Sequence, residues 1–69
     1  YESINARQQL ALDYLREQGS INNSTYQELN DISRQTATRD LSDLAEKGIL
    51  IQRGKGPGTY YILASYESM

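Results

Sequence analysis

The stretch "SRQTATRDLSDLAEKGIL", residues 33–50, contains the start, the apolar face and the end of one helix, followed by the beginning of a strand. Ser33 is a typical helix N-cap, and Gly48 is typical of the position just after a helix. At about 100° per residue, four apolar residues fall on one stripe or at its edge: Ala37, Leu41, Leu44 and Ala45. The stretch therefore predicts an amphipathic helix whose polar face either contacts a ligand or simply faces solvent.

Two further helices are predicted before this stretch. Asn5 can cap a helix that runs to about Gln18 and stops at Gly19. Ser24 followed by Gln27 indicates a capping box at the start of a short second helix. Apolar residues recur at helical spacing in both, at Leu10, Ala11, Tyr14 and Leu15 and then at Tyr26 and Leu29. Only a few residues separate the second helix from the third, which is the helix-turn-helix arrangement.

A β-hairpin is predicted after the third helix. "ILIQR" (49–53) and "TYYIL" (59–63) are short β-prone runs, and "GKGPG" (54–58) between them has the glycines and proline of a turn. In a helix-turn-helix protein, such a hairpin is called the wing. Three helices followed by a wing predict an α+β fold of the winged-helix class.

The length of 69 residues predicts one small domain, residues 1–69, with a thin core. We expect the folded part to span residues 4–63 and residues 64–69 to form a frayed tail. Because the chain begins at Tyr1, we expect it to be part of a longer protein. No apolar run approaches the roughly 20 residues that cross a bilayer, so we expect a cytoplasmic protein without a membrane partner.

The composition argues against catalysis and metal binding. The chain has no cysteine and no histidine, so it lacks thiolate ligands, the usual zinc ligand and the usual general base. The Gly-Lys-Gly run lies between two predicted strands, whereas a phosphate-binding P-loop joins a strand to a helix. We therefore expect no enzymatic activity, no metal and no cofactor in this chain.

The charge is distributed unevenly along the chain. The net charge is −2, which disfavours non-specific coating of nucleic acid. Residues 34–55, however, hold five of the seven basic residues and only three acids, a net charge of +2 against −4 for the rest. The basic residues are thus concentrated in the half that contains the third helix and the wing.

The polar face of the third helix carries side chains that suit DNA. On the helical wheel Gln35 and Arg39 lie opposite the apolar stripe, with Thr36 and Thr38 on the flanks. Arg pairs with guanine, Gln with adenine, and Thr with a thymine methyl group or a phosphate. Together with Arg34, they occupy the first two turns, the part that enters the major groove in helix-turn-helix proteins.

A solvated surface is the alternative for both polar segments. Arg39 and Asp43, four residues apart, can simply pair with each other, and Asp43 and Glu46 would repel phosphate. Arg53 and Lys55 in the turn "RGKGPGT" suit a phosphate backbone, but they also suit an ordinary soluble loop.

The tyrosines are explained better by packing than by base stacking. Tyr14 and Tyr26 lie at core positions of their predicted helices. Tyr60 and Tyr61 fall on opposite faces of a strand, so one packs inward and the other lies on the outer side of the wing.

The sequence also resembles a known type of domain. "SRQTATRDLSDLAEKGIL" followed by "GKGPGTYYIL" resembles the C-terminal winged-helix domain of bacterial Fic-family proteins. It equally resembles the matching domain of Schlafen/AlbA-type ATP-binding regulators, often labelled RecG-helicase-like. "RQQLALDYL" and "INNSTYQEL" extend the resemblance over about residues 4–63, and DeoR-type repressors share a weaker version.

This resemblance implies DNA binding through the third helix and the wing. It points to helix contacts at Ser33, Arg34, Gln35, Thr36, Thr38 and Arg39, and to wing contacts at Arg53, Lys55 and Thr59. Pro57 departs from the pattern, because many relatives have a second basic residue there, and this departure predicts weaker contact with phosphate.

Two functions remain open from the sequence. The first is a module of a bacterial transcriptional regulator or Fic-type protein that binds double-stranded DNA. The alternative is an interaction or dimerisation module that docks on the parent protein's N-terminal enzymatic domain or on a second copy. The acidic charge, Asp43 and Glu46, and an exposed wing tyrosine suit this alternative. An adenylyltransferase or ATP-binding activity is expected only of the parent protein.

Overall fold

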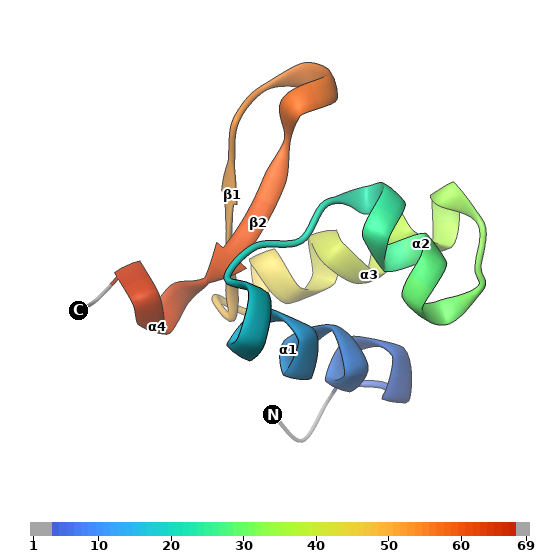
Figure 1. Ribbon diagram of the computed structural model, residues 1–69, viewed down its shortest axis with the longest axis horizontal. Helices are drawn as coiled ribbons and strands as arrows, with labels where there is room; N and C mark the ends of the chain where they lie inside the picture. The colour runs from blue at the N-terminus through green and yellow to red at the C-terminus, as the bar shows by residue number, and fades with distance from the viewer. Residues whose placement is uncertain (1–3, 68–69) are drawn as a thin grey trace.

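The computed structural model describes residues 4–67 and shows three helices followed by an antiparallel hairpin that projects away from them (Figure 1). In chain order the elements are α1 (Ala6–Gln18), α2 (Asn23–Asn30), α3 (Arg34–Glu46), β1 (Leu50–Arg53), a 3₁₀ turn (Gly56–Gly58), β2 (Tyr60–Leu63) and α4 (Ala64–Glu67). β1, the turn and β2 form the wing. This order confirms the predicted α+β winged-helix fold.

The C-terminal segment differs from the prediction of a frayed tail over residues 64–69. Residues 64–67 form the short helix α4, and residues 68 and 69 lie outside the described part of the chain. The Ala64 N–H donates a hydrogen bond to the Ile49 carbonyl at 2.9 Å, which holds the start of α4 beside the residue that precedes β1. This contact is long-range, so local sequence signals did not indicate it.

The ends of α1 are those that the sequence predicts. Asn5 accepts a hydrogen bond from the Gln8 N–H at 2.8 Å, and the Gln8 side chain accepts one from the Asn5 N–H at 2.9 Å. These two bonds form a reciprocal capping box that satisfies backbone donors at the helix start. Gly19 ends the helix with φ of 89°, a conformation that glycine adopts without steric cost.

The start of α2 differs from the predicted capping box at Ser24 and Gln27. Asn22 is the N-cap instead, and its side-chain oxygen accepts from the Thr25 N–H at 2.8 Å. Asn22 is extended and lies two residues before Ser24, so the helix already begins at Asn23. The Gln27 side chain bonds to Asn23 rather than to a cap backbone. The prediction was wrong because two good N-cap residues stand close together.

One buried cluster joins the three helices to the base of the wing. Its members are Ala11, Leu12, Leu15, Ile21, Tyr26, Ala37, Leu41, Leu44, Leu50, Tyr61 and Leu63. The list confirms Ala37, Leu41 and Leu44 of the predicted α3 stripe and the inward position of Tyr26, whereas Ala45 at the edge of the stripe is half-buried. Tyr14 is half-buried and packs against the cluster, whereas Leu10 is 43% exposed and Leu12 fills the core in its place.

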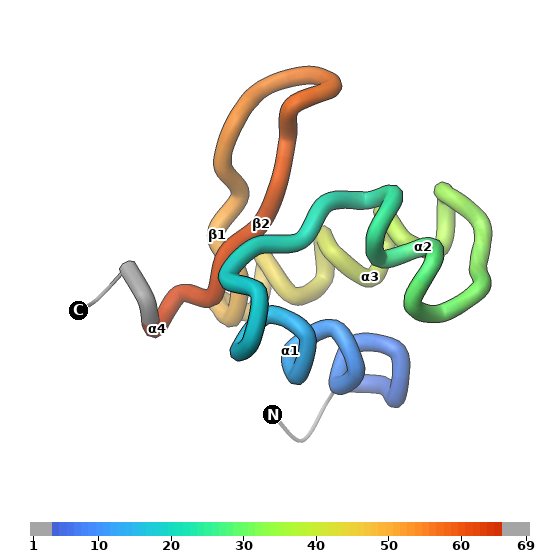
Figure 2. The backbone as a smooth tube through the Cα atoms, in the orientation of Figure 1, coloured from blue at the N-terminus to red at the C-terminus, as the bar shows by residue number. Residues whose placement is uncertain are grey.

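The connection between α1 and α2 anchors the wing. Ile21 donates to the Tyr61 carbonyl at 3.0 Å and accepts from the Tyr61 N–H at 2.7 Å, as one residue pair of a third strand would. Figure 2 shows this connection passing beside β2. Tyr61 is consequently buried at 9% exposure, while Tyr60 is 40% exposed on the opposite face, which confirms the predicted alternation.

The turn of the wing depends on a close backbone approach. Gly54 has φ of 77°, and a Cβ atom on it would run into the carbonyl oxygen of Gly58. Gly56 also has a positive φ, of 54°, but a Cβ atom there would meet open space. The two glycines therefore differ in what an alanine would encounter.

We predict that Gly54→Ala lowers the free energy of unfolding by about 1–3 kcal/mol, because it adds a steric clash to the cost of left-handed backbone. Gly56→Ala is the matched control, and it should lose only about 1 kcal/mol. Urea denaturation followed by circular dichroism measures both. Equal losses would contradict the close approach between Gly54 and Gly58.

Candidate nucleic-acid interface

The start of α3 is held by Ser33, whose hydroxyl oxygen accepts from the Thr36 N–H at 3.2 Å. The Ser33 hydroxyl also donates to Thr36 Oγ1 at 3.1 Å. Ser33 is exposed and Thr36 is half-buried. Both predicted contact residues therefore use their side chains first to cap the helix, and this fixes where its first turn begins.

The other predicted residues of α3 are exposed: Arg34, Gln35, Thr38 and Arg39. Residues four apart lie on one side of a helix, so Arg34 and Thr38 share one stripe, and Gln35 and Arg39 share the next. Within residues 4–67, Arg34 and Arg39 have no acidic partner. The stripe that carries Gln35 and Arg39, the two predicted base contacts, is therefore accessible to a ligand.

The predicted alternative, an ion pair between Arg39 and Asp43, is wrong. Asp43 pairs instead with Lys47, its Oδ2 atom lying 2.6 Å from Nζ, and it also accepts from the Gln8 side chain at 2.9 Å. Gln8 is 1% exposed and links α1 to α3. Asp43 thus faces α1 and the end of α3, and its charge is balanced by Lys47.

Asp40 lies between α3 and the helices α1 and α2, and the sequence analysis did not identify its structural role. Its carboxylate accepts from Arg7 Nε at 2.7 Å and from Arg7 Nη2 at 3.2 Å. It also accepts from the Tyr26 hydroxyl at 2.9 Å and from the Asn5 amide at 3.4 Å. Asp40 is only 4% exposed, so these four bonds compensate for the desolvation of a charge. Asp40 lies three residues after the core residue Ala37, and on a helical wheel this spacing places it beside the apolar stripe. The helical wheel could therefore have indicated that Asp40 is buried.

These contacts shift the pKa values of four groups, and the hydrogen bond to Asp40 raises that of Arg7. Burial by itself would raise the pKa of Asp40, but the hydrogen bonds from Arg7 and Tyr26 and the charge of Arg7 outweigh it and hold that pKa below its usual range. Hydrogen bonds from Lys47 and then Gln8 lower the pKa of Asp43. Burial, followed by the bond to Asp40, raises the pKa of the Tyr26 hydroxyl, which therefore remains a donor at neutral pH.

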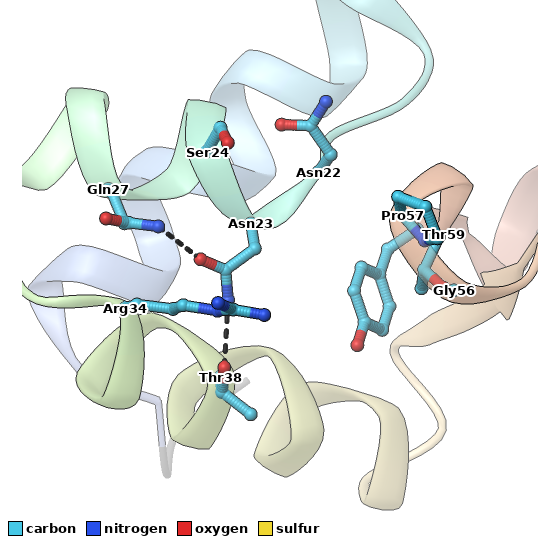
Figure 3. Close-up of a pocket in the computed structure, with 10 residues that line it drawn as sticks. Asn22, Asn23, Ser24, Gln27, Arg34, Thr38, Gly56, Pro57 and Thr59 are labelled. Carbon is cyan, nitrogen blue, oxygen red and sulfur yellow. Dashed lines mark hydrogen bonds between the residues drawn. The ribbon is translucent and has the colours of Figure 1, made fainter.

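A groove of about 360 Å³ lies between the starts of α2 and α3 and the turn of the wing (Figure 3). Three of the predicted contact residues border it, namely Arg34, Thr38 and Thr59. Gln35, Arg39, Arg53 and Lys55 are not among its lining residues. The structure therefore brings part of the predicted set together around one groove and leaves the rest on neighbouring surfaces.

The start of α2 supplies the wall of this groove that sequence reasoning missed. Its polar residues there are Asn22, Asn23, Ser24 and Gln27. The available signal was the polar run "NNS" before a helix, which the sequence analysis used only to place a turn and a cap. On the opposite side, Gly56 and Pro57 of the wing approach the same space.

The predicted wing residues differ in exposure. Lys55 is exposed immediately before the turn, and its carbonyl accepts from the Gly58 N–H at 3.0 Å. Arg53 ends β1 opposite Tyr60 and is half-buried, as is Thr59. Lys55 is thus the cation that the wing presents most openly.

The described residues 4–67 contain neither a membrane-spanning helix nor a metal-binding cluster. No helix among them is long and apolar enough to cross a membrane. No group of three His, Cys, Asp or Glu side chains in the same range is placed to hold a metal ion.

Comparison with known proteins identifies the type of domain. Residues 7–60 match the family of DeoR-like helix-turn-helix domains. Among solved structures, the DIP2311 protein from Corynebacterium diphtheriae resembles this chain over 83% of its length, with a TM-score of 0.79 and 24% sequence identity. The match spans 10% of the DIP2311 chain, so the likeness concerns the fold of one domain. No curated protein matches the chain. The Fic and Schlafen/AlbA parents are not tested by these matches and stay predictions.

We predict that Asp40→Asn lowers the free energy of unfolding by about 1–3 kcal/mol at pH 7, because charge-assisted hydrogen bonds to a buried carboxylate are lost. The folded-state pKa of Asp40 lies below the ordinary value of about 3.9, so this stabilisation is present above about pH 4. It disappears as the pH falls through the folded-state pKa.

Urea unfolding between pH 7 and pH 2.5 measures this dependence, and the difference between wild type and Asp40→Asn should shrink in acid. Asp13→Asn is the control, because Asp13 forms an exposed pair with Arg16 and such pairs contribute little. A difference that stays constant over the whole pH range would contradict the role of the Asp40 charge.

Proposed function

Because the chain belongs to the family of DeoR-like helix-turn-helix domains, a class of winged-helix DNA-binding domain, we propose that α3 enters the major groove and the wing holds backbone phosphates. The module would serve a bacterial transcriptional regulator. Fic-family and Schlafen/AlbA proteins are the parents that the sequence resemblance favours.

The observation that carries this proposal is the separation of charge on α3. Asp40 is buried against Arg7, and Asp43 is paired with Lys47. Arg34 and Arg39 are exposed and have no acidic partner within residues 4–67. Of the three acids of α3, Asp40 and Asp43 are thus held in ion pairs, whereas Glu46 lies exposed at the C-terminal end of the helix. The exposed cations Arg34 and Arg39 lie in the N-terminal half, which would be the part that contacts a polyanion.

The side chains of α3 then divide by role. Arg39 suits a guanine and Gln35 suits an adenine, because each can form two hydrogen bonds with the edge of that base. Arg34 and Thr38 border the groove beside the wing and suit the phosphate backbone. Ser33 and Thr36 hold the first turn, whose free N–H groups favour an anion.

The wing supplies the remaining contacts. Lys55 and Arg53 suit phosphates on the side of the groove opposite α2, and Thr59 borders the groove itself. With so few cations, one copy should bind weakly, and tight binding would need a second copy or further domains that double the contacts.

A second candidate function rests on the outer face of the wing. Ile51 pairs with Ile62 in the hairpin, both are half-buried, and Tyr60 beside them is 40% exposed. Such a face suits a partner protein or the parent's enzymatic domain. It predicts that Ile51→Ser, but not Arg39→Ala, abolishes association with that partner.

We expect an NMR titration of the 69-residue chain with a 20-base-pair mixed-sequence duplex at low salt to shift the amides of residues 33–39 and 53–59. The shifts should fade as salt rises, because binding releases counterions from the DNA and this release becomes less favourable at higher salt concentration. No shifts at millimolar duplex would contradict the proposed function.

We predict different losses for the two kinds of contact. Arg39→Ala should cost about 1–3 kcal/mol of binding free energy and relax the preference for one base, because a base-edge contact is lost. Lys55→Ala should weaken binding evenly across sequences and lower the salt slope by about 1.

Selection from a pool of randomised duplexes, followed by salt titrations of the recovered sequence, measures both effects. The same kind of loss from both variants would contradict the division between base contact and phosphate contact.

A further inference from the structure

One hydrogen bond connects the start of α2 to the exposed side of α3, and a second one within α2 supports it. Asn23 Nδ2 donates to Thr38 Oγ1 at 2.9 Å, and Gln27 Nε2 donates to Asn23 Oδ1 at 2.5 Å (Figure 3). Asn23 is half-buried and Thr38 is exposed. All three residues border the groove between the helices and the wing. The exposed side of α3 is therefore joined to α2 by polar side chains that are not part of the buried core.

The bond from Asn23 determines how the Thr38 hydroxyl can act. A hydroxyl group has one proton to donate and two lone pairs to accept with, and Asn23 occupies one lone pair. No acceptor for the Thr38 proton is found among residues 4–67. A threonine in a helix divides between two χ1 rotamers, and the bond to Asn23 selects one of them. The Thr38 hydroxyl thus keeps its proton available for an acceptor in the groove.

Gln27 sets the orientation of the Asn23 amide. Its side-chain N–H bonds to the amide oxygen of Asn23, so the amide nitrogen is the atom that faces Thr38. Gln27 is one turn after Asn23 on the same helix, a spacing that brings the two side chains together. Gln27 thus donates a hydrogen bond to Asn23, and Asn23 donates one to Thr38. The hydroxyl proton of Thr38 has no acceptor among residues 4–67.

We propose, on the basis of the proposed DNA-binding function, that Asn23 is a positioning residue for Thr38 and holds its hydroxyl proton toward an acceptor atom of DNA. Arg34, one turn before Thr38 and on the same stripe of α3, borders the same groove and supplies a positive charge beside that proton. The acceptor is an oxygen or nitrogen atom of the DNA, either on a phosphate or on a base edge.

A double-mutant cycle tests this coupling. Asn23→Ala, Thr38→Val and the double variant are compared for binding to a fluorescein-labelled 20-base-pair mixed-sequence duplex at low salt. Each single variant should bind roughly 3- to 10-fold more weakly, as expected for one hydrogen bond. The double variant should bind no more weakly than Thr38→Val alone, because Asn23 acts through Thr38. Losses that multiply would overturn the proposal.

Ser24→Ala is the matched control. Ser24 borders the same groove from the same turn of α2 but forms no hydrogen bond to Thr38 within residues 4–67, so its effect should multiply with that of Thr38→Val. Thr38→Ser keeps the hydroxyl and should retain most of the binding while Asn23 is present. Because serine is not β-branched, Asn23→Ala should cost more in that background than in wild type.

Thermal melting separates positioning from a structural role. Asn22 remains as the N-cap of α2, so Asn23→Ala should keep the helix and lower the melting temperature only slightly. A large drop in melting temperature, with multiplying losses in binding, would assign Asn23 a structural role and overturn the proposal.

The same measurements distinguish failure of this proposal from failure of the DNA-binding function. If the wild-type chain does not bind the duplex, both the DNA-binding function and the positioning role of Asn23 are ruled out. A wild-type chain that binds, with Asn23→Ala binding equally well, removes only the positioning role. In a pool of randomised duplexes, an even loss for Asn23→Ala supports a phosphate acceptor, and a relaxed preference at one base position supports a base edge.

Discussion

The carboxylate of Asp40, in the middle of α3, accepts hydrogen bonds from Arg7 and Asn5 at the start of α1 and from the Tyr26 hydroxyl of α2. A buried charge is costly unless its oxygen atoms are satisfied, so the three helices have to meet where these donors converge. Gln8 adds a bond to the Asp40 carbonyl at 3.0 Å. The rotation of α3 about its own axis is thereby fixed, and with it the side that faces outward.

The fixed rotation explains how a chain with a net charge of −2 presents a cationic helix face. A count along the sequence treats Asp40 and Asp43 as opponents of Arg34 and Arg39. The structure instead pairs those acids with Arg7 and Lys47. Net charge describes the whole molecule, whereas contact with DNA depends on the charges that share one face.

The parts of the fold that local signals determine were predicted well. Ser33, Asn5 and Gly19 act as caps because their side chains or backbone satisfy groups within one helical turn. The apolar stripe of α3 and the alternation of Tyr60 and Tyr61 follow from helix and strand periodicity.

What the sequence did not reveal depends on contacts between residues far apart in the chain. Asp40 and Arg7 are separated by 33 positions, and Asn23 and Thr38 by 15. Nothing in the local sequence shows that such side chains meet, because their distance is set only after the helices pack. Helix periodicity predicted the exposed positions of Arg34, Gln35, Thr38 and Arg39, but not the half-buried position of Thr36. The wall of the groove that α2 forms could be found only in the folded chain.

The two sides of the groove are held in different ways. α2 and α3 are joined on the inner side through Tyr26 and Asp40 and on the outer side through Asn23 and Thr38, so their relative angle is constrained at two points. The wing is anchored to the helices at its base by the Ile21–Tyr61 pair. Its exposed turn, residues 54–58, is closed by short-range backbone bonds, and such segments have low local stability. The groove therefore combines a helical wall that is held by side-chain bonds at two points with a wing wall that is anchored at its base and closed by backbone bonds within its turn.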